Sequence, residues 1–134
     1  MIKKKNTMST KEIYKRLPVD DIFDSSCDFF RIPRKRLESH CNERRFTEPR
    51  FMIWLIMYID MYNKPTLNEI GKLFSQRDHA TIRSGICRIK TLMNVYPEVD
   101  KRFQDLCLFV FGDLKLYEYA RIFELKVRKD YRKK

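Results

Sequence analysis

Residues 66–95 read TLNEIGKLFSQRDHATIRSGICRIKTLMNV, and the fold predicted for the chain depends on this stretch. Thr66 is followed three residues later by Glu69, a capping-box spacing that predicts a helix from Leu67 to Phe74. Ser75-Gln76-Arg77 then leaves room only for a tight turn. Since a second helical pattern follows at once, the two segments are expected to form a helix-turn-helix.

The second helix is expected to begin near Asp78, because an aspartate is a favourable N-cap, and to continue to about Val95. Its apolar residues recur at helical spacing and are expected to face inward: Ile82, Ile86, Ile89 and Met93. Its other side carries polar and basic residues: His79, Thr81, Arg83, Ser84, Arg88 and Lys90. In helix-turn-helix proteins the first residues of the second helix reach base edges in the major groove, while the first helix lies across the backbone. Imidazole, hydroxyl and guanidinium groups have the donors and acceptors that such contacts need.

The segments on either side are also predicted to be helical, from apolar residues spaced by three and four. The expected helices cover residues 19–30, 33–37, 49–62, 97–111 and 113–131. The helix from Pro49 to about Tyr62 is apolar nearly all round, which places it at the centre of the domain. Gly112 is expected to end the helix that Pro97 opens. The last helix is amphipathic and basic, with an apolar stripe of Leu116, Tyr119, Ala120, Phe123, Val127 and Tyr131.

The charge of the chain is strongly positive and unevenly distributed. The formal net charge is +11 in 134 residues. Residues 1–16 carry about +5, residues 31–50 about +4 and residues 121–134 about +5, whereas residues 17–30 carry about −4. Patches of this kind are typical of a surface that faces a polyanion such as nucleic acid. Within the second patch, residues 39–47 show no periodicity and are interpreted as a basic loop that contains Arg44 and Arg45.

The composition argues against several other classes of protein. A hydrophobic fraction of 43% supplies a core, so the chain is not expected to be disordered. No secretory signal is recognisable and the longest apolar run, Phe51–Ile59, is too short to cross a bilayer, so a cytoplasmic location is expected. The four cysteines are widely spaced and are interpreted as reduced thiols, and the four aspartates of residues 20–28 as a solvated helix face rather than a metal site. With no phosphate-binding glycine loop of the Gly-x-x-x-x-Gly-Lys type and no catalytic constellation, neither an enzyme nor a cofactor is expected.

Ile70-Gly71 followed by Arg77-Asp78-His79-Ala80-Thr81-Ile82 resembles the signature of the C-terminal DNA-binding domain of the bacterial replication initiator DnaA. The resemblance extends over residues 19–111, through Val19-Asp20-Asp21-Ile22, Phe29-Phe30-Arg31-Ile32, Pro49-Arg50 and Ile89-Lys90. It implies an all-α, compact helical domain with a DnaA/Trp-repressor-like helix-turn-helix. It also implies binding to double-stranded DNA at sites like DnaA boxes.

Carried over to this sequence, the resemblance implies that Asp78, His79 and Thr81 read bases, with Arg50 beside them and with Arg77 and Arg88 near phosphates. Arg44 or Arg45 takes the place of the family's minor-groove arginine only if the loop shifts, because Asn42 stands at the matching position. Other departures are Ala80 for a threonine, Ser84-Gly85 for His-Ala and Glu48 for an arginine. The candidate DNA-binding residues are Arg44, Arg45, Arg50, Asn68, Arg77, Asp78, His79, Ala80, Thr81, Arg83 and Arg88.

The chain is therefore expected to consist of a basic arm (1–18), a DnaA-like domain (19–111) and a basic helical extension (112–134). The leading hypothesis is sequence-specific DNA binding in replication initiation or control, or in transcription regulation, by a nucleoid-associated, phage or mobile-element protein. Two alternatives remain open: a structural or protein-interaction role, with a partner or a second copy held by residues 113–131, and non-specific nucleic-acid binding driven by charge alone.

Overall fold

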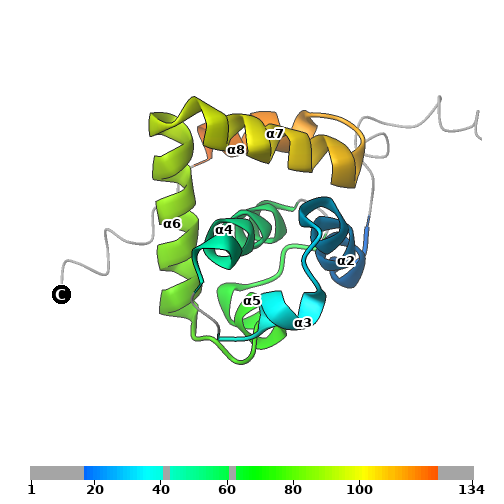
Figure 1. The fold of residues 1–134 in the computed structure, drawn as a ribbon, viewed down its shortest axis with the longest axis vertical. Helices are drawn as coiled ribbons and strands as arrows, with labels where there is room; N and C mark the ends of the chain where they lie inside the picture. Colours follow the sequence, from blue (N-terminus) through cyan, green and yellow to red (C-terminus); the bar gives the residue numbers. More distant parts are fainter. Residues whose placement is uncertain (1–16, 41–42, 61–62, 124–134) are drawn as a thin grey trace, which may run out of the picture.

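Helix α4 (Arg44–Ile59) lies at the centre of the fold, and the other described helices surround it (Figure 1). The computed structural model describes residues 17–40, 43–60 and 63–123, and every regular element in these ranges is a helix. The others are α2 (Val19–Phe30), α3 (Arg34–Glu38), α5 (Leu67–Leu73), α6 (His79–Val95), α7 (Pro97–Phe111) and α8 (Lys115–Ile122). The all-helical fold class is thus confirmed. Apart from Leu17 and Pro18, the expected basic arm lies outside the described residues.

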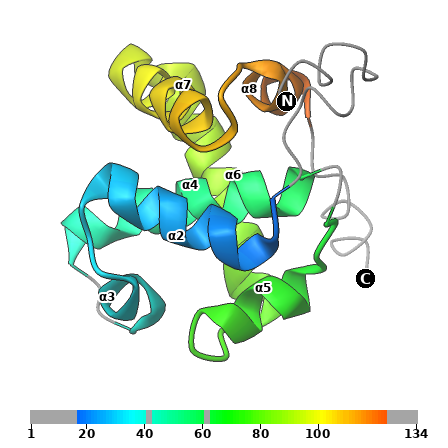
Figure 2. The same cartoon turned by 90° about the vertical axis from the view of Figure 1, so that its right-hand side faces the viewer.

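The helices are arranged in two end groups joined by α4 and α6. Figures 1 and 2 show α7 and α8 across one end of the molecule and α3 and α5 at the other, with α2 and α6 on opposite sides of α4. The central position predicted for the apolar helix is confirmed, because its side chains from Met52 to Met57 are all buried. The helix-turn-helix pair, α5 and α6, buries part of each helix, including Ile70 and Ile86, and exposes the remainder.

Helix α4 begins at Arg44, five residues before the predicted start at Pro49. The prediction of a basic loop over residues 39–47 is therefore wrong for residues 44–47, which are helical. Arg44 and Arg45 lie in the first turn of the helix instead. The early start follows from the burial of Phe46, which is 3% exposed and fixes this turn against the core. Pro49 is tolerated in the second turn, where its missing N–H removes one hydrogen bond.

The acidic face of α2 is tied to α3 by one arginine. The guanidinium of Arg34 contacts carboxylate oxygens of Asp20 at 2.9 Å, Asp24 at 3.0 Å and Glu38 at 3.0 Å. These hydrogen bonds raise the pKa of Arg34 against the opposing effect of burial. The four aspartates were interpreted as a solvated helix face. Two of them, Asp20 and Asp24, also hold α3 in place through Arg34. Among the described residues, no group of His, Cys, Asp and Glu has the arrangement of a metal site.

Helices α4 and α6 cross closely because residue 85 is glycine. A Cβ placed on Gly85 would lie 2.5 Å from a ring carbon of Trp54 and 2.7 Å from the ring of Phe51. From the sequence, Gly85 was only a departure from the alanine of the DnaA pattern. The structure gives its reason, since no side chain fits between the two helices at this position.

Helix α8 packs on α4 and α7 and is shorter than the predicted tail helix. Gly112 ends α7 with φ +83°, as predicted, but α8 stops at Ile122 and residues 124–131 lie outside the described ranges. Tyr117 is buried and Tyr119 is 45% exposed, so the expected apolar stripe is wrong at Tyr119. The division of the chain at residues 18 and 111 stays a prediction.

Two further sequence interpretations concern the thiols and the membrane. Cys27, Cys87 and Cys107 are reduced thiols, and burial raises the pKa of Cys27 to about 12, so that the Cys27 thiol is protonated at neutral pH. Cys41 lies outside the described residues. None of the helices described is both long and apolar enough to cross a membrane.

We predict that Gly85→Ala destabilises the fold by about 1–3 kcal/mol, because the new methyl group overlaps the Trp54 ring. Helix propensity alone would raise the free energy of unfolding by about 1 kcal/mol. The sign of the measured change in this free energy therefore separates the effect of helix propensity from that of the steric overlap. Urea unfolding of the variant measures it, with Ser84→Ala at the exposed neighbouring position as the control. A Gly85→Ala protein more stable than the original would contradict the crossing geometry.

Candidate nucleic-acid interface

The first helix of the pair, α5, begins with a complete capping box. The hydroxyl oxygen of Thr66 accepts from the backbone N–H of Glu69 at 3.1 Å, and the Glu69 carboxylate accepts from the backbone N–H of Thr66 at 2.8 Å. The prediction made from the Thr66–Glu69 spacing is confirmed. This cap fixes where α5 starts, and thus which of its residues, Asn68 among them, lie in the exposed first turn.

The turn between α5 and α6 is held directly against α5. Ser75 and Gln76 both have φ +59°, a left-handed conformation that reverses the chain. The backbone N–H of Arg77 then donates to the carbonyl oxygen of Gly71 at 3.0 Å. A Cβ on Gly71 would lie 2.0 Å from the carbonyl oxygen of Arg77, so this close approach requires glycine. The tight turn predicted from the sequence is confirmed.

Two arginines fasten this turn and α4 to the carboxyl end of α3. Arg77 donates to the carbonyl oxygens of Glu38 at 3.3 Å and Ser39 at 2.8 Å. Arg50 donates to the carbonyl oxygens of Leu37 at 2.9 Å and Ser39 at 3.2 Å. The carbonyl groups at a helix C-terminus have no partners within the helix and carry partial negative charge, which a guanidinium satisfies well. We call these contacts the α3 carbonyl clamp.

The α3 carbonyl clamp corrects two of the site assignments made from the resemblance. Arg50, expected beside the DNA, is 3% exposed and is used inside the fold. Arg77, expected near phosphates, is half-buried, and burial lowers its pKa while its guanidinium bonds to carbonyl groups. Arg83, predicted on the outer side of α6, is also in the interior at 8% exposed. Arg50 and Arg77 are buried by their contacts with the end of α3, which sequence spacing along α6 does not reveal.

The first turn of α6 presents its side chains to solvent. Asp78 is the N-cap, as predicted, and its carboxylate accepts from the backbone N–H of Thr81 at 3.0 Å. This hydrogen bond lowers the pKa of Asp78, so the side chain stays a carboxylate at neutral pH. His79, Ala80 and Thr81 are exposed, and the inward positions predicted for Ile82, Ile86, Ile89 and Met93 are confirmed.

The exposed face continues along α6 beyond its first turn. Ser84 and Arg88 follow Thr81 at helical spacing and are exposed. Arg88 belonged to the predicted site, whereas Ser84 was left out of it, although its spacing from Thr81 could have identified it. Lys90, predicted on the same side, instead donates to the carbonyl oxygen of Ala120 at 2.6 Å. We call Asp78, His79, Ala80, Thr81, Ser84 and Arg88 the α6 face.

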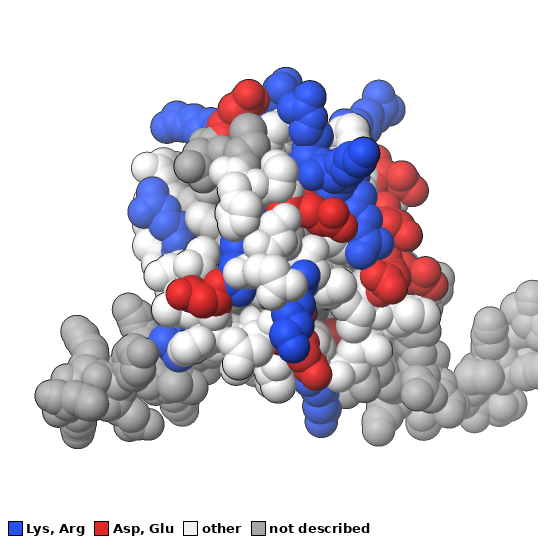
Figure 3. Space-filling model, turned by 90° about the horizontal axis from the view of Figure 1, so that it is seen from below, with Lys and Arg blue, Asp and Glu red and all other residues white. Residues whose placement is uncertain are grey.

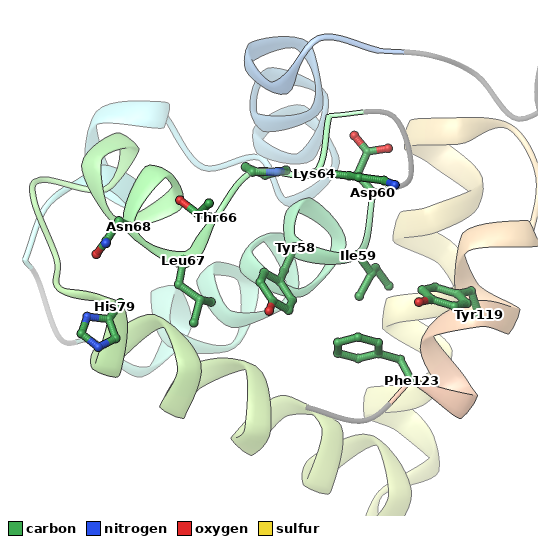
Figure 4. A pocket seen from close by; sticks show the side chains of 11 residues that line it. Tyr58, Ile59, Asp60, Lys64, Thr66, Leu67, Asn68, His79, Tyr119 and Phe123 are labelled. Carbon is green, nitrogen blue, oxygen red and sulfur yellow. The ribbon is translucent and has the colours of Figure 1, made fainter. Parts of the chain in front are cut away.

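The remaining predicted residues lie on the surface near α5 and α4. Arg44 and Arg45 are exposed, and Arg45 contacts the Glu43 carboxylate at 2.8 Å. Asn68 is exposed and, with His79, lines one end of a hollow of about 770 Å³, as Figure 4 shows. Viewed from the end formed by α3 and α5, the surface carries Lys and Arg side chains among uncharged residues, with several carboxylates along one edge and others scattered across the face (Figure 3). The structure thus joins Asn68 to the α6 face and places Arg44 and Arg45 at the start of a different helix.

The departure from the family pattern at residue 48 also has a structural reason. The carboxylate of Glu48 makes two contacts with the guanidinium of Arg102 on α7, at 2.6 Å and 3.1 Å. These contacts raise the pKa of Arg102. Residue 48 therefore ties α4 to α7, whereas an arginine at this position would face another arginine.

The fold and the exposed second helix define a helix-turn-helix domain. Residues 19–89 match the family described as the bacterial DnaA protein helix-turn-helix. The chromosomal replication initiator protein DnaA of Jannaschia sp. (strain CCS1) is 31% identical over 86 residues, which is 63% of this chain and 18% of that protein. The chain belongs to the DnaA helix-turn-helix family and spans about a fifth of the length of this relative. No solved structure matches it.

We predict that Arg50→Met lowers the free energy of unfolding by about 3 kcal/mol, because the carbonyl groups of the α3 carbonyl clamp lose a charged donor in the interior. Urea unfolding measures the change. Arg45→Met, which alters an exposed arginine of the same helix, is the matched control and should change stability by less than about 0.5 kcal/mol. Equal losses in the two variants would show that Arg50 has no special structural role.

Proposed function

We propose that the chain binds double-stranded DNA sequence-specifically, with the α6 face in the major groove. The observation that carries the proposal is the exposed, Asp78-capped first turn of α6 in a helix-turn-helix of the DnaA family. A capped helix start projecting from the fold is the element that such domains insert into DNA. Its side chains point away from the core, so they reach base edges without rearrangement of the domain.

The residues of the α6 face have distinct roles in this proposal. His79 donates to or accepts from a base edge, and the methyl groups of Ala80 and Thr81 contact thymine methyl groups. Asp78 accepts from a base amino group with the oxygen that its cap leaves available, or acts as the cap alone. Ser84 and Arg88, one and two turns further along, face bases or phosphates at the groove wall. The absence of the family's hydroxyl at Ala80 favours a target that differs from the usual DnaA box.

Residues outside α6 position the protein on the phosphate backbone. Asn68 is exposed in the first turn of α5, and its side-chain amide donates to a phosphate oxygen in this proposal. Arg44 and Arg45 start α4 and supply two exposed cations. Arg50 and Arg77 act from inside the fold through the α3 carbonyl clamp, and we assign neither of them a direct contact with DNA.

The biological process in the proposal is replication control or transcription regulation. The relative is named a chromosomal replication initiator protein, and residues 19–89 of this chain match the DnaA helix-turn-helix. The proposal therefore concerns recognition of a DNA site and assigns the described residues no catalytic step. Selection of duplexes from a random pool, with affinities measured across salt concentrations, tests it: a common motif with mismatch costs of about 1–3 kcal/mol supports specific binding. Binding without any motif, or no binding, would refute it.

We predict that His79→Ala lowers discrimination at one base pair by about 1–3 kcal/mol, because a base-edge hydrogen bond is lost. The selected motif and its single mismatches are measured for the variant and the original. Thr91→Ala is the control, since Thr91 is exposed on the same helix more than two turns beyond Thr81. If discrimination at every position is unchanged in His79→Ala, the role assigned to this residue is wrong.

We predict that Arg45→Ala weakens binding to all duplexes by a similar factor and reduces the salt slope of log K by about 0.9, because one phosphate contact is lost. Lys101→Ala on α7, an exposed lysine to which the proposal assigns no DNA contact, is the control and should leave the slope unchanged. A sequence-dependent loss in Arg45→Ala would instead indicate a base contact by this arginine.

A further inference from the structure

A hollow of about 420 Å³ lies where the end of α2, helix α3 and the start of α4 meet. Three arginines line it, one from each of these elements: Arg31, Arg36 and Arg45. Its other lining side chains are apolar: Phe30, Ile32, Pro33, Phe46 and Pro49. We call it the arginine hollow. Of the DNA-binding residues predicted from the sequence, it contains Arg45 alone, so Arg31 and Arg36 are new candidates.

The positions of the three arginines are defined by the fold. The guanidinium carbon of Arg45 lies 4.9 Å from the ring centroid of Phe46, and that of Arg36 lies 5.9 Å from the same centroid. At these distances an aromatic ring attracts a cation. Phe46 is buried in the core and therefore holds both guanidinium groups at one place. Arg31 is held through its backbone, which ends α2 in the left-handed conformation and donates to the carbonyl oxygen of Asp28 at 3.2 Å.

The positive charge of the arginine hollow is only partly balanced by neighbouring carboxylates. In the part of the chain that the structure describes, its arginines form one ion pair, in which Arg45 donates through Nε to the Glu43 carboxylate at 2.8 Å. A guanidinium has further N–H donors, so this contact leaves Arg45 able to bind a second anion. Arg34, by contrast, contacts three carboxylates. The acidic face of α2 therefore neutralises Arg34 and not the arginines of the hollow.

The arginine hollow has a fixed position relative to the α6 face. Helix α3, which carries Arg36, is joined to the turn before α6 by the α3 carbonyl clamp, in which Arg77 donates to the Ser39 carbonyl oxygen at 2.8 Å. The imidazole of His40, directly after α3, donates to the carbonyl oxygen of Ser75 in the same turn at 3.0 Å. Because these contacts hold α3 against the start of α6, the fold sets the distance between the hollow and the α6 face.

We infer that the arginine hollow binds adjacent phosphate groups of the duplex whose bases the α6 face reads, with Arg31 and Arg36 as contacts in addition to Arg45. The inference rests on the proposed function. Guanidinium groups bind phosphate through paired N–H···O hydrogen bonds, and the apolar wall packs against the deoxyribose between the phosphates. A phosphate contact at a set distance from the recognition helix fixes the register of the protein on DNA without reading a base.

The test compares two full-length double variants with equal loss of charge. The first, R31Q with R36Q, changes the arginine hollow; the second, K35Q with K115Q, changes lysines of α3 and α8 that do not line it. All four side chains are exposed, so both variants should unfold in urea at the midpoint of the original protein. We expect the first variant to reduce the salt slope of log K by about 1–2, at about 0.9 for each phosphate contact. At about 0.1 M salt its affinity should fall roughly 10- to 100-fold with an unchanged motif, while the second variant keeps the original slope.

Ethylation of single phosphates in the selected duplex locates the contact. For the original protein, ethylation of particular phosphates next to the motif should weaken binding. For the variant with R31Q and R36Q, ethylation of the same phosphates should cause no further loss, because the side chains that bind them are absent. Interference that is identical in the original and this variant would overturn the inference.

The salt dependence also separates this inference from the proposed function. An unchanged slope in the first variant, with the motif retained, would overturn the inference and leave the proposed function intact. Equal losses in the two double variants would assign the effect to net charge and would also overturn it. If the original protein selects no motif, sequence-specific binding is refuted, while a reduced slope in the first variant alone still supports the phosphate contacts.

Discussion

The arrangement of the helix-turn-helix depends on the α3 carbonyl clamp. A five-residue helix cannot satisfy the carbonyl groups at its own end, and here the guanidinium groups of Arg50 in α4 and Arg77 in the turn before α6 do so. One group of acceptors therefore holds the start of α4 and the turn before α6 at the same point. The hydroxyl of Ser75 also donates to the Glu38 carbonyl oxygen at 2.5 Å. As a result, the turn that orients α6 is fixed to the core by charged hydrogen bonds.

Two glycines set the distances at which the helices of this domain meet. At Gly71 the backbone of the turn occupies the space that a side chain would need, and at Gly85 the Trp54 ring does so. Burial of Ile82, Ile86 and the other apolar residues of α6 then holds its inner side against α4. Because the inner side is fixed in this way, the opposite side must face solvent. The geometry of the α6 face is therefore a consequence of core packing rather than of the surface residues themselves.

The arginines of the candidate site fall into two groups with different physical roles. Arg50, Arg77 and Arg83 are buried or half-buried, and two of them form the α3 carbonyl clamp. Arg45 and Arg88 are exposed to solvent, and Arg45 contacts the exposed Glu43 carboxylate. An interior guanidinium bonded to carbonyl groups is costly to remove, whereas an exposed one contributes little to stability. In the proposed function, the first group maintains the shape that presents the second group to DNA.

Local signals in the sequence determined the all-helical class, the helix-turn-helix and the residues that cap it. The caps at Thr66, Asp78 and Gly112 depend on neighbours within a few positions, so they were predictable from the sequence alone. The tertiary structure alone decided which arginines are exposed and where α4 begins. Arg77 bonds to carbonyl groups 38 and 39 residues away, and burial of Phe46 extends α4 through the predicted loop. Such contacts join segments that are distant in sequence, so the local spacing of apolar residues along a helix does not predict them.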